Sequence, residues 1–271
     1  MMNQVFSMVP TNPLGFSDVG TLAAPSFADI DNDGDLDAFV GEGFGNTFFY
    51  KNLGTASNPI FAAAIINPFG LTNAGFYINS AFVDIDGDAD LDVFVGNSDG
   101  KIIFSRNTGT VSAPVFAPAT INPFGLSDVG SYADPSLVDI DGDADLDAFV
   151  SNSDGNILFF RNTGTISAPV FASALMNPFG LSDAGGVFAS ITLVDTDDDG
   201  DLDAFVGNVD GDTLYFKNTG TVNNPIFATA KFNPFGLNDV EGNASPVFAD
   251  IDSDGDLDAF FGGKLGNTLF F

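Results

Sequence analysis

The sequence contains no cysteine, no histidine and no tryptophan. Disulfides and thiolate chemistry are therefore excluded, as are the common zinc sites and the commonest general base. The longest apolar runs, such as 60–66, are far too short to cross a bilayer, so no membrane insertion is expected. The first residues include neither a basic stretch nor a long apolar stretch, so no signal peptide is visible. We expect either a part of a larger protein or another kind of export signal.

Basic residues are also scarce: 7 Lys and Arg stand against 37 Asp and Glu, which gives a net charge of −30. Such a surface repels phosphate backbones and anionic lipids, so nucleic acid and membrane surfaces are not expected as partners. Hydrophobic residues, in contrast, make up 45% of the chain and include 31 Phe. This is ample material for a packed core, and 271 residues suit a single domain spanning 1–271.

One acidic string repeats along the whole chain. Residues 29–37 read Asp-Ile-Asp-Asn-Asp-Gly-Asp-Leu-Asp, and the string recurs in steps of 55, 55, 56 and 55 residues. The further copies are at 84–92, 139–147, 195–203 and 250–258. An Asn-Pro-(Leu/Phe)-Gly motif keeps the same phase, at 12–15, 67–70, 122–125, 177–180 and 233–236. The chain is therefore built from five copies of one unit.

Each copy contains four short segments with the composition of strands. In the first copy they are 26–29, 36–41, 47–51 and 60–66, rich in Phe, Val and Ile and separated by Gly, Asn, Asp and Pro. No segment has a sustained helical period. Four strands in each repeat predict an all-β protein, a five-bladed β-propeller with four-stranded antiparallel blades, and a solenoid is the main alternative.

The two ends of the sequence together make up one unit. The last copy stops after its third strand, whereas residues 5–6 and 12–15 match 60–61 and 67–70 in phase. We therefore expect the N-terminal strand to complete the last blade and close the ring. A piece cut at arbitrary points from a longer array is the alternative.

The acidic loops have the pattern of cation sites. Carboxylates at alternate positions of a tight loop can converge on one point, and calcium takes six to eight oxygen ligands. The null hypothesis is a set of solvated acidic turns, but 26 of the 37 acids fall in these five strings and would repel one another without a cation. The candidate ligands are Asp29, Asp31, Asp33, Asp35 and Asp37; Asp84, Asp86, Asp88, Asp90 and Asp92; Asp139, Asp141, Asp143, Asp145 and Asp147; Asp195, Asp197, Asp199, Asp201 and Asp203; and Asp250, Asp252, Asp254, Asp256 and Asp258.

The segments 27–41 and 248–262 resemble the calcium-binding FG-GAP/VCBS repeat, which integrin α-subunit propellers share. The resemblance covers essentially the whole chain. It implies a β-propeller in which each acidic loop joins the first two strands of a blade and holds one Ca²⁺, about five for the chain. Carried over to the first blade, it assigns the side chains of Asp29, Asp31, Asp33 and Asp37 and the carbonyl of Asp35. Propellers of this family more often have seven blades, so five would be unusual.

Two loops depart from the pattern. Their sixth residues are Ala89 and Ala144 instead of glycine, and a positive φ there would strain alanine by about 1 kcal/mol. These loops carry Gly87 and Gly142 instead, and we expect them to turn differently. A basic residue ends the third strand on the acidic-loop side and is interpreted as structural, offsetting the carboxylates. It is Lys51, Arg106, Arg161 or Lys217.

The repeats differ most in two loops, one before the first strand and one between the second and third strands. In a propeller both loops lie on the face opposite the acidic loops, the face that integrin-like propellers use for ligands. One position in register defines a candidate ligand site; its residues are Leu22, Tyr77, Tyr132, Phe188 and Asn243. The null hypothesis for these residues is ordinary packing between blades.

Three classes of function remain. A calcium-stabilised extracellular or cell-surface binding or adhesion scaffold is the first, with an unknown protein or glycan as its partner and a monomeric chain. A lectin with repeated pockets is the alternative. An enzyme is not expected, because no triad with His or Cys can form, and a carboxylate pair such as Asp134 with Glu241 is only a formal possibility.

Overall fold

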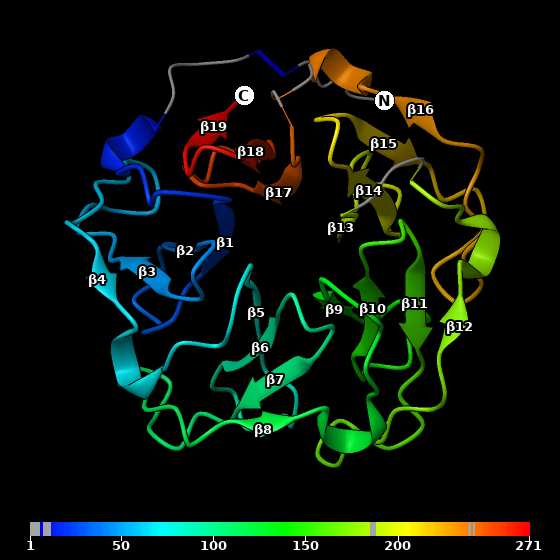
Figure 1. The fold of residues 1–271 in the computed structure, drawn as a ribbon, viewed down its shortest axis with the longest axis horizontal. Coiled ribbons are helices and arrows are strands. Elements are labelled where there is room, and N and C mark those ends of the chain that lie inside the picture. The colour runs from blue at the N-terminus through cyan, green and yellow to red at the C-terminus, as the bar shows by residue number, and fades with distance from the viewer. Residues whose placement is uncertain (1–5, 8–11, 185–187, 238–239, 241) are drawn as a thin grey trace.

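The five repeats form five antiparallel sheets arranged around a central axis (Figure 1). The computed structural model describes all residues except 1–5, 8–11, 185–187, 238, 239 and 241. Four sheets have four strands each, and in the described part of the chain the sheet of the last repeat has three. The expected five-bladed all-β propeller is confirmed. Most of the strand expected to complete the last blade lies outside the described residues.

Strands of the same rank occupy equivalent places in each blade. The innermost strands are β1 (Ala24–Ala28), β5 (Asn79–Val83), β9 (Asp134–Val138), β13 (Ser190–Val194) and β17 (Ser245–Ala249). The second strands are β2 (Asp37–Gly41), β6 (Asp92–Gly96), β10 (Asp147–Ser151), β14 (Asp203–Gly207) and β18 (Asp258–Gly262). The third strands are β3 (Thr47–Tyr50), β7 (Ile102–Ser105), β11 (Ile157–Phe160), β15 (Thr213–Phe216) and β19 (Thr268–Phe270). The outermost strands are β4 (Ile65–Ile66), β8 (Thr120–Ile121), β12 (Leu175–Met176) and β16 (Lys231–Phe232).

Each outermost strand has only two residues. In the first blade, the sequence predicts a longer strand, over residues 60–66. The earlier part of this segment is held both by a side chain and by two backbone hydrogen bonds, from Ala62 to Lys51 and from Leu53 to Ile60. The Asn52 amide oxygen accepts hydrogen bonds from the backbone amides of Gly54 and Ile60, at 2.9 and 3.0 Å. Phe61 then forms a single bridge with Asn52 before the chain reaches β4.

Each Asn-Pro-(Leu/Phe)-Gly motif forms a short 3-10 turn. The five turns are η1 (Pro13–Gly15), η2 (Pro68–Gly70), η3 (Pro123–Gly125), η4 (Pro178–Gly180) and η5 (Pro234–Gly236). Each turn from η2 to η4 binds the next blade through its backbone; for example, the Phe116 amide donates to the Phe69 carbonyl at 2.8 Å. The turns thus link neighbouring blades at the outside of the ring.

The core lies between the blades and consists mainly of phenylalanine. Five clusters of buried residues fill the five interfaces between neighbouring blades. Phe39 stacks on Phe82 of the next blade with ring centroids 4.0 Å apart, and Phe27 and Phe260 join the first and last blades at 4.4 Å. No helix in the described ranges is long and apolar enough to span a membrane.

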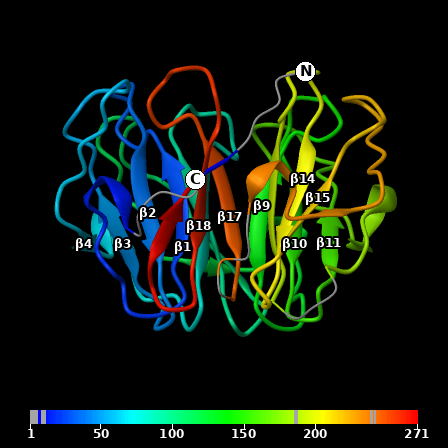
Figure 2. The same cartoon turned by 90° about the horizontal axis from the view of Figure 1, so that it is seen from above.

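This topology fixes where the loops lie. The strands of each blade run along the ring axis (Figure 2). Since neighbouring strands are antiparallel, the loops between the innermost and second strands all lie on one face. The segments before the innermost strands and the turns between the second and third strands lie on the other face. The two candidate sites are therefore at opposite ends of the ring.

Candidate functional site

The five acidic loops share one backbone arrangement. The first aspartate accepts hydrogen bonds from the backbone amides of the fifth and sixth residues of its loop. Asp29 accepts from Asp33 at 3.1 Å and from Gly34 at 3.0 Å, and the same pair of bonds recurs in the other four loops. These bonds wrap each loop around its first carboxylate.

The fourth and sixth residues of every loop have positive φ. They are Asn32 and Gly34, Gly87 and Ala89, Gly142 and Ala144, Asp198 and Gly200, and Ser253 and Gly255. Ala89 and Ala144 therefore adopt the left-handed conformation that strains alanine, with φ of 74° and 72°. We expected these two loops to turn differently. For the backbone conformation this prediction is wrong, because the same two positions are left-handed in all five loops. What differs is one bond, from the Gly87 or Gly142 amide to the first aspartate at 2.7 Å.

The first, third and fifth aspartates of each loop come together. In each group, one carboxylate oxygen per residue lies within 4.8 Å of the others. The triads are Asp29, Asp31 and Asp33; Asp84, Asp86 and Asp88; Asp139, Asp141 and Asp143; Asp195, Asp197 and Asp199; and Asp250, Asp252 and Asp254. These five triads can bind metal ions.

In the first four loops, the ninth aspartate lies deeper than the triad. Asp37 is 1% exposed, and its Oδ1 accepts a hydrogen bond from the Asn52 backbone amide at 2.7 Å. The ninth aspartates of the next three loops, Asp92, Asp147 and Asp203, accept the same bond from Asn107, Asn162 and Asn218. In the fifth loop, Asp258 instead accepts from the Ile251 amide at 3.2 Å.

The carboxylates leave buried oxygen atoms without hydrogen-bond partners. In the first loop these are Oδ1 of Asp31, Oδ1 of Asp35 and Oδ2 of Asp37. Burial, with repulsion from Asp31 and Asp33, raises the pKa of Asp37 to about 7. An unpaired cluster of hard oxygen donors is the ligand set that Ca²⁺ takes, and the absence of nitrogen and sulfur donors disfavours softer metals. The residues present therefore fit a calcium ion, which these aspartates would hold.

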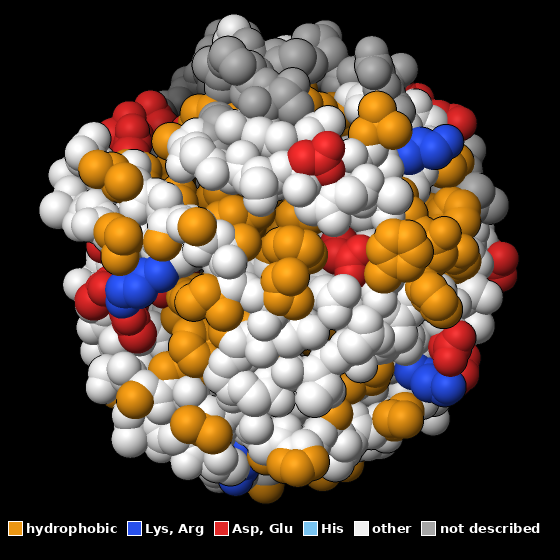
Figure 3. Space-filling model, turned by 60° about the vertical axis from the view of Figure 1, so that its left-hand side comes forward, with side chains coloured by type: hydrophobic (Ala, Val, Ile, Leu, Met, Phe, Trp, Pro, Cys, Tyr) orange, Lys and Arg blue, Asp and Glu red, His pale blue; other side chains and the backbone are white. Residues whose placement is uncertain are grey.

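The basic residue after the third strand pairs with the same carboxylates. Lys51 contacts Asp31 and, at 3.3 Å, Asp33, which lowers the pKa of Asp33. Arg106, Arg161 and Lys217 form the corresponding pairs with the third aspartate of their own loops, Asp86, Asp141 and Asp197. Figure 3 shows basic side chains beside acidic ones near the rim. The prediction that these bases offset the acidic loops is confirmed.

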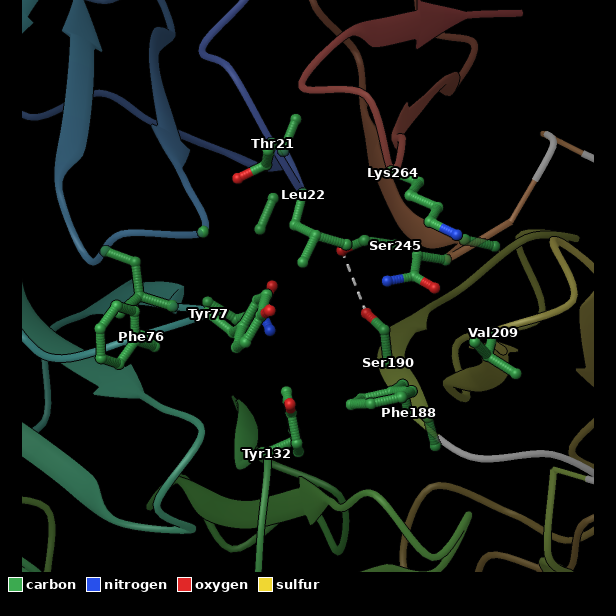
Figure 4. Close-up of a pocket in the computed structure, with 18 of the residues that line it drawn as sticks. Thr21, Leu22, Phe76, Tyr77, Tyr132, Phe188, Ser190, Val209, Ser245 and Lys264 are labelled. Carbon is green, nitrogen blue, oxygen red and sulfur yellow. Dashed lines mark hydrogen bonds between the residues drawn. The ribbon is translucent and has the colours of Figure 1, made fainter.

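A pocket of about 540 Å³ opens on the opposite face, at the mouth of the central channel (Figure 4). All five residues of the predicted ligand site line it: Leu22, Tyr77, Tyr132, Phe188 and Asn243. The turns between the second and third strands contribute Phe44, Val209 and Lys264. The sequence comparison among repeats thus identified residues that lie around one cavity.

A ring of backbone hydrogen bonds fixes the five predicted residues. All five have positive φ, between 50° and 61°. Each donates its backbone amide to the turn of the preceding blade; Tyr77 donates to Gly43 at 3.1 Å, for example, and Leu22 of the first blade donates to Lys264 of the last at 3.1 Å. The wall of the pocket is therefore a continuous series of contacts between blades.

Three aromatic rings form an arc along one side of the pocket. The centroids of Tyr77 and Tyr132 are 5.2 Å apart, and Phe188 meets Tyr132 edge-on at 4.1 Å. Tyr77 is 36% exposed, and the other two rings are half-buried. The arc is thus open to the cavity instead of being enclosed in the core.

The innermost strands place polar groups at the base of the pocket, which sequence reasoning missed. The hydroxyls of Ser190 and Ser245 are 3.2 Å apart (Figure 4). Burial raises the pKa of the neighbouring Asp134 to about 7, partly opposed by hydrogen bonds from Ser190 and the Ile191 amide. The available signal was register, because these residues come two positions after the ring residues. Glu241, considered as a partner of Asp134, lies outside the described residues.

Known proteins resemble parts or all of this chain. Residues 29–95 and 84–150 each match the model of the FG-GAP-like repeat. No curated protein matches the sequence. Two crystal structures of BBS1N in complex with ARL6DN, soaked with lead or mercury, are similar at TM-scores of 0.48 and 0.46. Each is 11% identical and matches 98% of this chain and 96% of the other. The chain therefore contains FG-GAP-like repeats, which form a β-propeller whose loops carry repeated aspartate triads.

Proposed function

We propose that this chain is a calcium-stabilised binding module that holds a protein or glycan ligand in the pocket at the channel mouth. The observation that carries the proposal is the pocket itself, to which all five blades contribute. Ligand sites typically enclose about 300–1,000 Å³ and are mostly apolar with a few polar groups. The aromatic arc and the hydroxyl pair at the base match that description.

The calcium loops support a place outside the cell or on its surface. Extracellular calcium modules bind with a Kd of ~10⁻⁴–10⁻³ M. Sites of that strength would stand empty in the cytosol and fill in calcium-rich surroundings. The unpaired oxygens of the acidic loops would then gain a partner, and the propeller would gain stability.

Binding is favoured over catalysis by the chemistry of the pocket. The described residues of its lining include no acid, and the chain has no histidine or cysteine. The buried carboxylate below it, Asp134, is engaged by Ser190 and Ile191. We therefore propose that the cavity positions a ligand and does not transform it.

The proposal includes a ring closed by the N-terminal segment, within a single monomeric domain. The Phe6 amide donates to the Phe235 carbonyl at 2.7 Å, as Phe116 donates to Phe69 between other blades. Asn12 and Thr268 bond each other in both directions at 2.8 Å, as Asn67 and Thr47 do. These contacts of Phe6 and Asn12 support the closure of the last blade by the N-terminal segment, which would leave no open sheet edge for a second chain.

A lectin is the second candidate, because the arc suits sugar rings. Exposed aromatic faces are hydrophobic platforms, while Asn79, Asn243 and the serine hydroxyls can exchange hydrogen bonds with sugar hydroxyls. The pocket is shared by all blades, so this arrangement supports one central ligand instead of one ligand per repeat.

A glycan array and a pull-down test the proposal, each run with calcium and with chelator. We expect a ligand signal that requires calcium and that the double variant Tyr77→Ala with Tyr132→Ala loses. Phe232→Ala, at an exposed position of β16 far from the pocket, is the control and should bind normally. A signal unchanged in the double variant would contradict the site. If the double variant melts far below the wild type, the rings are structural wedges and the assignment is wrong.

A further inference from the structure

The pocket is electrically unlike the rest of the molecule. The chain carries 37 acidic and 7 basic residues, yet the described residues that line the pocket include one base, Lys264, and no acid. Four of the other bases pair with the acidic loops, and Lys101 pairs with Asp99 at 3.0 Å. Among the described residues, no acid lies within ion-pair distance of Lys264. Among the described residues of the lining, the charged side chain is thus positive, in a strongly negative protein.

The positive charge lies across the cavity from the aromatic arc. Lys264 comes from the turn between β18 and β19 of the last blade, whereas the arc comes from the second, third and fourth blades. Figure 4 shows the Lys264 amine on the side of Leu22 and Ser245, with Tyr77, Tyr132 and Phe188 around the opposite side. A flat group resting on the arc can therefore present a substituent to the amine.

We propose, on the basis of the binding function above, that the pocket recognises a six-membered ring that carries a carboxylate. The ring lies against Tyr77, Tyr132 and Phe188, and the carboxylate pairs with Lys264. A hydrogen bond between charged groups is roughly twice as strong as one between neutral groups. Lys264 alone supplies the positive charge for this bond. The surrounding negative surface disfavours ligands with several charges, so a single carboxylate fits best.

Calorimetry on the calcium-loaded full chain tests the ligand class with two matched pairs of probes. Glucuronate is compared with glucose, and phenylacetate with phenylethanol, so that sugar and aromatic sources are distinguished. We expect at least one acidic probe to bind about 10-fold more tightly than its neutral partner, with an advantage that salt weakens. Lys264→Met keeps the stem and should abolish this advantage, while Lys231→Met on β16 should preserve it.

Equal affinities within both pairs, no binding of any probe, or an advantage that survives Lys264→Met would overturn the ligand class. The binding function itself would still stand if the array or pull-down signal depends on Tyr77 and Tyr132. Loss of that dependence is what would overturn the function, so the two failures can be told apart.

A separate observation concerns the fourth acidic loop. Its ninth residue, Asp203, accepts hydrogen bonds at Oδ2 from two hydroxyls, those of Thr196 and Tyr215, the latter at 2.8 Å. Oδ1 of the same carboxylate accepts from the Asn218 amide at 2.7 Å. Both oxygens of this buried aspartate are therefore satisfied by the protein.

The first three loops lack both hydroxyls. Isoleucine stands where the fourth loop has Thr196, and phenylalanine stands where it has Tyr215. In these loops, Oδ2 of Asp37, Asp92 and Asp147 is buried and has no hydrogen-bond partner. Thr196 and Tyr215 occur in the same repeat, and both hydroxyls donate to Oδ2 of Asp203.

We infer that Thr196 and Tyr215 make the fourth loop more stable without metal than the first three, and that this loop binds calcium more weakly than the third. An oxygen already accepting two hydrogen bonds has no free lone pair, so calcium must displace a hydroxyl to gain the ninth aspartate as a ligand. Without metal, the same bonds remove the cost of leaving a buried carboxylate unpaired.

Two reciprocal double variants test this inference by calcium titration with a competing chelator. Thr196→Ile with Tyr215→Phe should strengthen one site several-fold, and Ile140→Thr with Phe159→Tyr should weaken one site by a similar factor. Hydrogen exchange of the chelated wild type provides a second measurement, in which 195–203 should be better protected than 139–147. Unchanged affinities in both variants would overturn the inference. If one variant fails to fold, equal protection of the two loops in the wild type would still overturn it.

Discussion

Two alanines occupy backbone positions that glycine fills in the other three acidic loops. A Cβ atom at the equivalent Gly34 would meet nothing within 4 Å, so the cost at Ala89 and Ala144 is conformational and not a clash. We expect Ala89→Gly and Ala144→Gly each to raise the free energy of unfolding by about 1 kcal/mol. Denaturant unfolding in saturating calcium measures the change. Gly34→Ala is the matched control and should lower stability by a similar amount; no change in either direction would contradict the strain.

The buried ninth aspartates make the stability of the metal-free protein depend on pH. Burial raises the pKa of Asp37, Asp92 and Asp147 to about 7 each, above the value of ~3.9 in an unfolded chain. Between these values the folded state holds protons that the unfolded state releases. Stability is therefore greatest in acid and is lost as pH rises through about 7.

We expect chelated protein to melt several degrees higher at pH 5 than at pH 7.5, and this difference to shrink in saturating calcium. Calcium binds the ionised carboxylates and so opposes the effect of protonation. Calorimetric melting at the two pH values measures it, and Asp37→Asn should remove part of the slope in chelator. The same slope with and without calcium would show that other groups control the pH dependence.

In the first four blades, the basic residue after the third strand is expected to compete with calcium for the carboxylates of the acidic loop. Arg161 follows β11 and pairs with Asp141 and, at 3.6 Å, Asp143, two members of the third triad. Arg161→Met should destabilise chelated protein by roughly 0.2–1 kcal/mol, as for other exposed pairs. It should also tighten calcium binding at one site, because a competing cation is removed.

Calcium titration and melting in chelator measure these two effects. Lys101→Met serves as the control, because its pair with Asp99 lies in the turn on the opposite face. Weaker calcium binding in Arg161→Met would mean that the arginine supports the site instead of competing for it.

The inner three strands of each blade could be predicted from the sequence, whereas the outer strand could not. Apolar runs between turn residues located β1, β2 and β3 to within two residues. The outer segment has the same apolar composition, but the Asn52 side chain accepts the Ile60 amide, so the pairing there is reduced to an isolated bridge. Composition does not reveal such bonds between a side chain and the backbone.

The candidate sites could also be predicted in part from the sequence. The acidic loops and the pocket ring repeat in register, so comparing the copies located them. Asp134, Ser190 and the pair of Thr196 with Tyr215 occur in single blades or act through neighbouring blades. The roles of these residues could be seen only from their contacts in the structure. A residue that differs from its equivalents in the other repeats can bind a ligand or only pack, and the sequence does not distinguish the two.

For the whole molecule, we expect about five calcium ions per chain at saturation, bound together with folding. Each triad supplies a ligand set, and a site with a Kd of about 0.1 mM adds about 1.8 kcal/mol at roughly 2 mM calcium. Five such contributions are large beside a typical stability of ~5–15 kcal/mol. Elemental analysis of calcium-equilibrated protein measures the stoichiometry, and a value of one or none would refute it.

Removing residues 2–10 tests the closure of the ring. Phe6 is buried in the cluster that joins the fourth and last blades, and its loss, with that of the proposed outer strand, would expose a sheet edge. We expect a large drop in melting temperature or oligomers formed by edge pairing, measured by calorimetry and light scattering. A truncated chain that stays monomeric and equally stable would contradict closure by this segment.

The meandering sheets also determine how the chain reaches this structure. Within every blade, each strand pairs with its neighbour in sequence, so these pairings close only short loops. The bond between Asn12 and Asn267, in contrast, spans 255 positions. Local pairings form quickly, whereas a contact between distant residues must first overcome the entropy of closing a long loop. The blades are therefore expected to fold early, and the joining of the last blade to the first is the slow final step.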